Sequence, residues 1–218
     1  MRKTIAIVGD SNIDNDPKKQ QIAFETGKIL IDNGYRIISG GLGGVMEAAF
    51  KGAHASEKYK EGDTIGILPM FSPLEANQYA DIIIPTGLDL YRNVIIANAA
   101  SAVIAIGGGA GTMSEITNAW ALHRLILAYS NVDGWSSKVA DTKIDQRNRY
   151  KGIDDKVYGI QTPQEAIEII NKYIDKYTLY HKGIVKGEYG IYFKLILKSP
   201  KAILGFFYSN LLFLLIQH

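Results

Sequence analysis

Short apolar runs alternate along this chain with longer segments of helical periodicity, and this alternation constrains the fold more than any other feature. The first run, residues 4–8, ends at Gly9, and Asp16-Pro17 then predicts a helix N-cap and first helical residue. Apolar runs of about five residues are typical of strands that are buried on both faces of a parallel sheet. Further strands are predicted at residues 35–39, 64–68, 81–84, 102–106, 125–129 and 157–160.

Helices are predicted between most of these strands. Asn33-Gly34 ends the first helix, and residues 162–165 (Thr-Pro-Gln-Glu) form a capping box that begins the last one. The small residues Ala48, Ala49, Gly52 and Ala53 would let the second helix approach the sheet closely. Strands that alternate with helices at this spacing indicate an α/β fold, with a doubly wound parallel sheet and helices on both faces. The predicted helices are residues 16–33, 45–55, 91–100, 162–177 and a segment that opens at Thr112.

The composition changes near residue 180. Residues 1–180 hold the alternating pattern and are predicted to form one domain, in which the polar residues 130–155 are either an ordered surface excursion or a lid. Residues 181–218 form a basic and apolar C-terminal extension with five lysines and one acidic residue, Glu188. Its apolar run, residues 202–216, would reach about 22 Å as a helix, short of the roughly 30 Å hydrocarbon core of a bilayer. We expect this run to be covered by its own domain, by a partner subunit or by peripheral contact with a membrane, and a full membrane span is the least favoured alternative.

Composition excludes several classes of protein. The chain has no cysteine, which excludes a disulfide scaffold, a thiolate zinc site and a cysteine nucleophile. The four histidines show no metal-ligand spacing, so no metal site is expected. Residues 1–180 carry slightly more acidic than basic side chains, which argues against a nucleic-acid partner. Because the first apolar run is too short for a signal-peptide core, a cytoplasmic protein is expected, with membrane association limited to the extension.

Glycine-rich turns, residues 40–44 and 107–111, follow two predicted strands and precede predicted helices. In an open parallel sheet, ligands bind outside the carboxyl ends of the strands, and a helix N-terminus there favours an anion. The turns lack the dinucleotide fingerprint and the P-loop lysine, which leaves a mononucleotide or a single phosphate as the predicted ligand. Asp10, Ser11 and Asn12 follow the first strand at the same edge, and they either line the pocket or form a polar turn.

The residues around these turns resemble a known family. Residues 107–115 (GGGAGTMSE) resemble the PGGxGTxxE signature of the Lonely-guy family, long misnamed lysine decarboxylases. Residues 39–49 (SGGLGGVMEAA) are similar to the first glycine turn of that family. Residues 64–69 (TIGILP) and Arg92-Asn93 resemble its molybdenum-cofactor-carrier-like branch. The resemblance covers residues 3–177.

This resemblance implies a Rossmann-like homodimer or higher homo-oligomer that binds a nucleotide phosphate and requires no cofactor. In the enzymatic branch, the activity is hydrolysis of the N-glycosidic bond of a nucleoside 5′-monophosphate such as AMP, with Arg92 and Glu115 as the catalytic pair. The products are the base and ribose 5-phosphate. The alternative is a non-catalytic carrier or sensor of a nucleotide or of the molybdenum cofactor. The residues implied to bind phosphate or nucleotide are Gly41, Gly43, Gly44, Met46, Gly108, Gly109, Gly111 and Thr112.

Three positions depart from the family pattern. Ile106 replaces the proline of the signature, Asn93 replaces the lysine that usually follows the arginine in plant enzymes, and Leu125 replaces a proline before the sixth strand. The glycines of residues 107–111, which are implied to bind phosphate, are retained. Hydrolysis and carriage therefore both remain alternatives for the function. Glu115 lies one helical turn beyond the glycines of residues 107–111, where its carboxylate would face a ribose. Arg92 can make a forked contact to phosphate.

Overall fold

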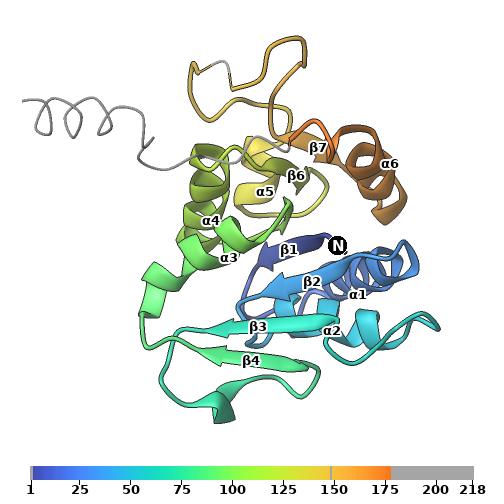
Figure 1. Cartoon of the computed structure of the whole chain (residues 1–218), viewed down its shortest axis with the longest axis vertical. Coiled ribbons are helices and arrows are strands. Elements are labelled where there is room, and N and C mark those ends of the chain that lie inside the picture. The colour runs from blue at the N-terminus through green and yellow to red at the C-terminus, as the bar shows by residue number, and fades with distance from the viewer. Residues whose placement is uncertain (1, 148, 178–218) are drawn as a thin grey trace, which may run out of the picture. The chain divides into compact units, whose positions relative to one another are not determined.

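A computed structural model describes residues 2–147 and 149–177 of the chain (Figure 1). In this part, seven strands form one parallel sheet in the order β4-β3-β2-β1-β5-β6-β7. Every predicted strand is present, and its bounds differ from the prediction by at most one residue. The strands are β1 (Thr4–Gly9), β2 (Arg36–Ser39), β3 (Thr64–Leu68), β4 (Ile82–Pro85), β5 (Ala102–Ile106), β6 (Leu125–Tyr129) and β7 (Tyr158–Ile160).

The helices begin where the sequence places capping residues. The side chain of Asp16 accepts a hydrogen bond from the N–H of Lys19, and that of Thr162 accepts one from Glu165. The predicted helix at residues 91–100 is instead divided into a 3₁₀ turn and a short α-helix, and the helix predicted to open at Thr112 begins two residues earlier. The helices are α1 (Pro17–Asp32), α2 (Val45–His54), α3 (Asn93–Ala99), α4 (Ala110–Ala121), α5 (Trp135–Val139) and α6 (Pro163–Tyr173), with 3₁₀ turns η1 (Pro73–Glu75) and η2 (Asp89–Arg92).

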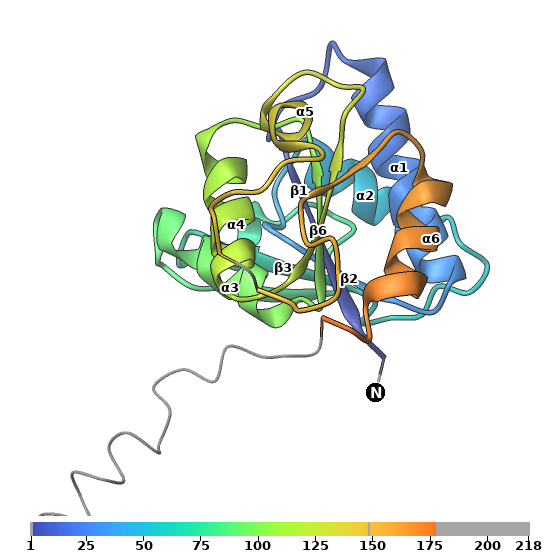
Figure 2. The same cartoon turned by 90° about the horizontal axis from the view of Figure 1, so that it is seen from above.

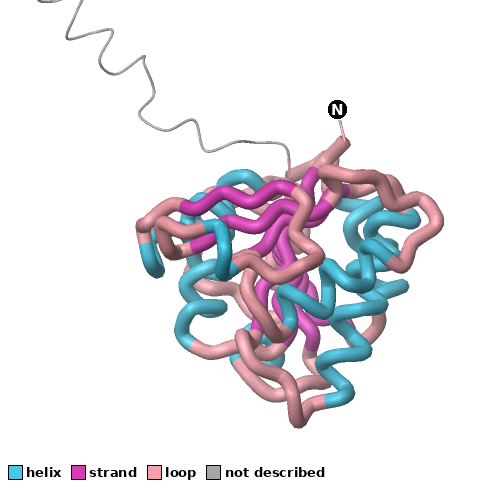
Figure 3. The backbone as a smooth tube through the Cα atoms, turned by 90° about the horizontal axis from the view of Figure 1, so that it is seen from below, coloured by secondary structure: helices cyan, strands magenta, loops and turns pink. Residues whose placement is uncertain are grey.

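Helices cover both faces of the sheet, with α1, α2 and α6 on one face and α3, α4 and α5 on the other (Figure 2). Figure 3 shows the strands as a layer between these two groups. Side chains along β1 alternate between the two cores: Ile5 and Ile7 pack on the α1 side, and Ala6 and Val8 pack on the α3 side. Because both faces of β1 are covered, its sequence is an unbroken apolar run. The parallel sheet with helices on both faces confirms the predicted doubly wound, Rossmann-like α/β fold.

The order of the strands creates a crevice at the centre of the sheet. From β1 the chain winds outward through β2 and β3 to β4, and it then returns to the other side of β1 as β5. Gly9 of β1 is in register with Ile106 of β5, so the residues that follow these strands emerge side by side. Such a switch point is where open parallel sheets bind ligands.

Gly52 packs closely against helix α1 and not against the sheet. A Cβ at Gly52 would lie 1.9 Å from the carbonyl oxygen of Phe24 in α1. A Cβ at Gly27 of α1 would likewise lie 1.9 Å from the carbonyl oxygen of Ala49 in α2. The expectation that Gly52 faces the sheet is therefore wrong, because the backbone that it approaches belongs to α1.

The described residues of this segment, 130–147 and 149–155, form an ordered excursion that contains α5. Near its far end, the buried guanidinium of Arg149 donates to both carboxylate oxygens of Asp155, at 2.7 and 2.8 Å. The same guanidinium lies 3.6 Å from the centre of the Trp120 ring. A segment that is held by a buried ion pair belongs to the packed domain, which favours the excursion over the lid.

The predictions for the extension, residues 181–218, lie outside the described residues. Among the helices of the described part, none combines the length and the apolar character needed to cross a membrane. The same part of the chain holds no group of three or more histidine, aspartate or glutamate side chains placed to bind a metal ion.

Candidate functional site

A cavity of about 370 Å³ lies at the carboxyl edge of the sheet, where β1 and β5 end. This volume is within the range of pockets that hold small organic ligands. The walls come from the ends of β1 and β2, the two glycine turns, η2 and the start of α4. Eight of the candidate residues named from the sequence line it: Asp10, Ser11, Met46, Arg92, Gly109, Gly111, Thr112 and Glu115.

A wider groove of about 530 Å³ lies between α1 and α2. Its charged lining residues are Asp14, Glu47 and Lys51, which are exposed or half-buried. The cavity at the carboxyl edge instead contains two buried charged side chains, Arg92 and Glu115. Desolvated ionisable groups in a cleft mark functional sites better than volume does, so we assign the chemistry to the carboxyl-edge cavity.

The second glycine turn needs glycine for its backbone. Gly107 and Gly108 have positive φ angles of 65° and 93°. A Cβ at Gly108 would lie 2.2 Å from Oγ1 of Thr112, so a side chain there would displace the start of α4. The N–H of Gly108 is already used, because it donates to the Asp10 carboxylate at 2.9 Å. The structure therefore gives Gly108 a role in shaping the turn.

Gly109 and Gly111 leave open space in front of the α4 N-terminus. A Cβ at either position would meet no atom within 4 Å. The first hydrogen bond within α4 runs from the N–H of Met113 to the carbonyl of Gly109. The N–H groups of residues 110–112 precede this bond and therefore have no acceptor within the helix. Amides that face an open cavity at the positive end of a helix dipole form an anion-binding site.

Glycines of the first turn bring backbones together. Gly41 and Gly44 have positive φ angles of 73° and 67°. A Cβ at Gly41 would lie 2.9 Å from Cα of Gly66 in β3, and one at Gly44 would lie 2.3 Å from the carbonyl oxygen of Asp10. Both positions thus exclude a side chain for steric reasons, independently of any ligand.

Leu42 of the first glycine turn and Met46, which follows this turn, are among the residues that line the cavity, whereas Gly41 and Gly44 are not. Ser39 at the end of β2 lines it as well. A Cβ at Gly43 would have its nearest contact at 3.4 Å, the carbonyl oxygen of Ser11. The structure places Met46 on the cavity wall, whereas phosphate binding by the glycines of this turn stays a prediction.

Asp10 joins the two glycine turns. Its carbonyl accepts the N–H of Val45, the first residue of α2, at 2.9 Å, and its carboxylate accepts the N–H of Gly108. The same carboxylate oxygen accepts from Nζ of Lys19 at 2.8 Å. Although burial lowers the pKa of Lys19, its hydrogen bond with Asp10 and the charge of Asp10 raise it above its usual value. Asp10 therefore lines the pocket and also orders the turns around it.

Arg92 and Glu115 meet inside the cavity, as the sequence predicts for two residues of one site. Nη1 of Arg92 lies 3.3 Å from Oε1 of Glu115 and donates to Oδ1 of Asn93 at 2.7 Å. The amide of Asn93 in turn donates to the Ser114 hydroxyl on α4. Nε of Arg92 is buried and has no hydrogen-bond partner among the described residues. A buried guanidinium N–H without a partner is costly, which marks Arg92 as a residue whose hydrogen bonds are incomplete in this structure.

Burial dominates the electrostatics of this pair. It raises the pKa of Glu115 to about 8, against the charge of Arg92, which lowers it. Burial also lowers the pKa of Arg92, while the charges of Glu115 and Asp89 raise it. Burial therefore favours the neutral form of Glu115 at neutral pH, although its carboxyl group lies 3.3 Å from the Arg92 guanidinium. The cavity is then suited to an anion.

Two residues at or beside the cavity, Lys19 and Leu90, were not predicted from the sequence. Lys19 lies in the first turn of α1 and is 9% exposed, while Leu90 of η2 forms a cavity wall. A signal for Lys19 exists in the sequence, since a lysine near a helix N-terminus opposes the helix dipole and needs a carboxylate nearby. Leu90 has no such signal, because its place depends on how the chain returns from β4.

Comparison with known proteins places the chain in a family. A protein of Archaeoglobus fulgidus described as uncharacterized is 43% identical over 112 residues, which are 51% of this chain and 70% of that protein. The molybdenum cofactor binding protein of Rippkaea orientalis is 28% identical, with a TM-score of 0.66 over 80% of this chain and 98% of that one. The molybdenum cofactor carrier protein of Chlamydomonas reinhardtii is 26% identical, with a TM-score of 0.62 over 78% and 98%. Residues 2–167 match the model of the SLOG cluster4 family, and the chain belongs to that family.

Proposed function

We propose that this chain binds a small phosphate-bearing ligand in the carboxyl-edge cavity and acts as its carrier, with a phosphorylated pterin of the molybdenum-cofactor type as cargo. One observation carries the proposal: Gly109 and Gly111 leave open space in front of the α4 N-terminus, in the same cavity that the Arg92 side chain lines. A phosphate in that space accepts hydrogen bonds from the α4 amides and from the guanidinium.

The charges of the cavity support an anionic cargo. Arg92 contributes a positive charge, and Glu115 contributes little negative charge at neutral pH because its pKa is raised to about 8. The carboxylate of Asp10 is bound to Lys19 and to a backbone N–H, so it is compensated within the protein. A protonated Glu115 can also donate a hydrogen bond to a carbonyl or ring nitrogen of the cargo.

The pterin class is supported by the two similar structures. Both belong to proteins named for the molybdenum cofactor, and each aligns with about four-fifths of this chain. That cofactor carries a phosphate, which fits the α4 N-terminus, and a polar ring system that needs hydrogen-bond donors and acceptors. Arg92, Asn93 and Glu115 supply such groups on one wall of the cavity.

Hydrolysis of a nucleoside 5′-monophosphate is the second candidate, because Glu115 and Arg92 share the cavity with the phosphate space. In that reaction, water adds to C1′ of the ribose while the C–N bond breaks and its electron pair leaves with the base, which takes up a proton. Glu115 as a neutral acid can give that proton, but it cannot serve as a general base until it is deprotonated. This requirement ranks hydrolysis below carriage.

The proposal is tested by titrating the full chain with three ligands by calorimetry: the isolated molybdenum cofactor, AMP and inorganic phosphate. The matched variants are Gly111→Ala, which puts a methyl group on the cavity wall, and Ala110→Ser, which adds one atom to the exposed neighbouring residue. We expect the cofactor to bind the wild type and Ala110→Ser equally, and Gly111→Ala at least tenfold more weakly. Chromatography of the AMP sample measures any release of adenine.

Carriage requires tight cofactor binding without turnover. Release of adenine from AMP that stops in Glu115→Gln would instead establish the hydrolase. Absence of binding to all three ligands, or binding that Gly111→Ala leaves unchanged, would refute the assignment of the cavity as the phosphate site.

A further inference from the structure

Gly40, which directly follows β2, differs from the other glycines of the first glycine turn. Its φ angle is not positive, so the backbone conformation does not demand glycine. A Cβ at this buried position would lie 2.5 Å from Nη2 and 2.9 Å from Cζ of Arg92, and 2.7 Å from Sδ of Met46. These atoms are at the ends of side chains, whereas a Cβ at Gly41 or Gly44 would meet backbone atoms. The guanidinium of Arg92 therefore occupies the space that a side chain at position 40 would fill.

The backbone on both sides of Gly40 is fixed. The buried hydroxyl of Ser39 donates to the carbonyl of Ile7 in β1 at 2.6 Å. On the other side, the carbonyl of Gly41 accepts the N–H of Asn77 at 2.9 Å. A backbone held in this way cannot move away from an added methyl group without breaking hydrogen bonds at a packed edge of the sheet. The end of the flexible arginine side chain would have to move instead.

Two acceptors hold the guanidinium of Arg92 through its other arm. Nη1 donates to Oδ1 of Asn93 at 2.7 Å and lies 3.3 Å from Oε1 of Glu115. The amide of Asn93 donates to the Ser114 hydroxyl at 2.7 Å, which connects the guanidinium to the start of α4. Nη2 has no hydrogen-bond acceptor among the described residues, so the steric fit over Gly40 defines its place. The guanidinium is thus positioned by acceptors at Nη1 and by the absent side chain at Nη2.

We propose that Gly40 is a positioning residue of the carboxyl-edge cavity: because position 40 has no side chain, the guanidinium of Arg92 lies where it binds the phosphate of a ligand. This inference rests on the proposed function, since Arg92 and the open space before α4 belong to one cavity. A guanidinium that is already held loses little side-chain entropy when the ligand binds. A methyl group at position 40 would displace it from Asn93 and Glu115, and the ligand would then have to order it.

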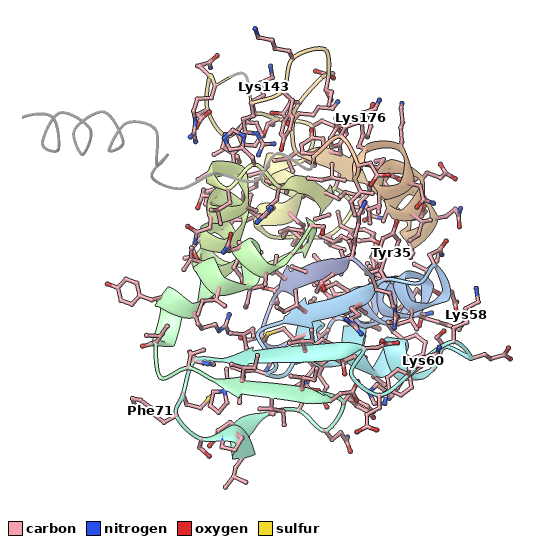
Figure 4. The ribbon with its side chains drawn as sticks, in the orientation of Figure 1. Tyr35, Lys58, Lys60, Phe71, Lys143 and Lys176 are labelled. Carbon is pink, nitrogen blue, oxygen red and sulfur yellow. The ribbon has the colours of Figure 1, made fainter. Side chains whose placement is uncertain are left out.

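Calorimetric titration of the full chain with inorganic phosphate and with AMP tests the effect on binding. The variants are Gly40→Ala and Arg92→Ala. The control is Lys60→Ala, which removes one positive charge at an exposed position before β3, on the other edge of the sheet (Figure 4). We expect both variants to bind the two probes at least tenfold more weakly, and the control to bind them as the wild type does. Binding by Gly40→Ala that equals wild-type binding would overturn the proposal.

The same titration in a Met46→Ala background separates an effect on Arg92 from an effect on Met46. We expect Gly40→Ala to weaken phosphate binding at least tenfold in this background too, because the nearest neighbour of the added methyl group is Nη2 of Arg92. Circular dichroism verifies that each variant is folded. A loss of affinity that disappears when Met46 is truncated would mean that the methyl group acts through the methionine, and the proposal would be overturned.

Urea unfolding tests the contact between Gly40 and Arg92 without any ligand. In the wild type, Gly40→Ala displaces the guanidinium and should lower the urea midpoint. In Arg92→Ala there is no guanidinium to displace, so the same methyl group should leave the midpoint unchanged or raise it. Equal decreases in both backgrounds would overturn the positioning role. If the wild type binds neither phosphate nor AMP, the proposed function fails, and this cycle alone decides whether Gly40 positions Arg92.

Discussion

Lys19 and Asp10 form a half-buried ion pair whose carboxylate also holds the second glycine turn, residues 107–111. Nζ of Lys19 lies 2.8 Å from Oδ2 of Asp10, and that same oxygen accepts the N–H of Gly108 at 2.9 Å. Through its carbonyl, Asp10 also holds the first residue of α2. One residue after β1 thus sets the spacing of both glycine turns, so the cavity is preorganised before a ligand arrives.

Asp10→Ala is expected to lower the free energy of unfolding by about 1–3 kcal/mol, because it leaves a mostly buried lysine and a backbone N–H without their acceptor. Asp10→Asn keeps an acceptor for Gly108 and should lose less. Urea denaturation measures both changes. A double-mutant cycle with Lys19→Met should show a coupling of about 1 kcal/mol, and additive effects would contradict the pairing.

A methyl group added to glycine is expected to have opposite effects in two helices. Gly52→Ala should destabilise the fold by about 2–3 kcal/mol, because its Cβ would lie 1.9 Å from the backbone of Phe24 and force α1 and α2 apart. Gly111→Ala meets open space and should be neutral or stabilise the fold by up to about 1 kcal/mol through helix propensity. Thermal and urea unfolding compare the two. Equal effects would show that the helix contact does not decide stability.

Arg149→Met is expected to destabilise the domain by about 3–5 kcal/mol, because it leaves the Asp155 carboxylate buried without its cation. The matched control is Arg147→Met in the same excursion. Arg147 pairs with Asp145 at the surface, where an ion pair contributes little, so its removal should leave unfolding unchanged. Urea unfolding measures both, and a loss of stability in the control alone would contradict the anchoring role of Arg149.

The parts of the structure that could be predicted are those set by local patterns. Five-residue apolar runs predict strands because both faces of each central strand are buried, and Asp16 and Thr162 predict helix starts because their side chains cap N–H groups. Both glycine turns also predict the edge of the sheet at which the cavity lies, because parallel strands all end there.

The remainder depends on contacts between distant segments. The helix predicted at residues 91–100 divides at Arg92 because η2 turns this guanidinium into the cavity, where it meets Glu115. Pairing of Lys19 with Asp10 also needs the three-dimensional path of the chain. Gly41 and Gly44 appear in sequence as ligand-binding glycines, yet their positive φ angles and close contacts show that the turn itself requires them. A pattern of glycines does not separate these two roles.

Glu115 is expected to make the stability of the protein fall as the pH rises. Its pKa is raised by burial to about 8 in the folded chain, against 4.5 for an ordinary glutamate. Between these values the folded state holds a proton that the unfolded state has released, so the free energy of unfolding decreases with pH and levels off above about pH 8.

Glu115→Gln removes this proton uptake and retains the shape of the side chain. We expect the stability of the wild type relative to Glu115→Gln to fall by about 1 kcal/mol per pH unit between pH 5 and 8, in urea titrations at each pH. The exposed control Glu57→Gln should show no such trend against the wild type. A wild-type advantage that grows with pH would mean that Arg92, rather than burial, sets the ionisation of Glu115, and the cavity would then hold a carboxylate at neutral pH.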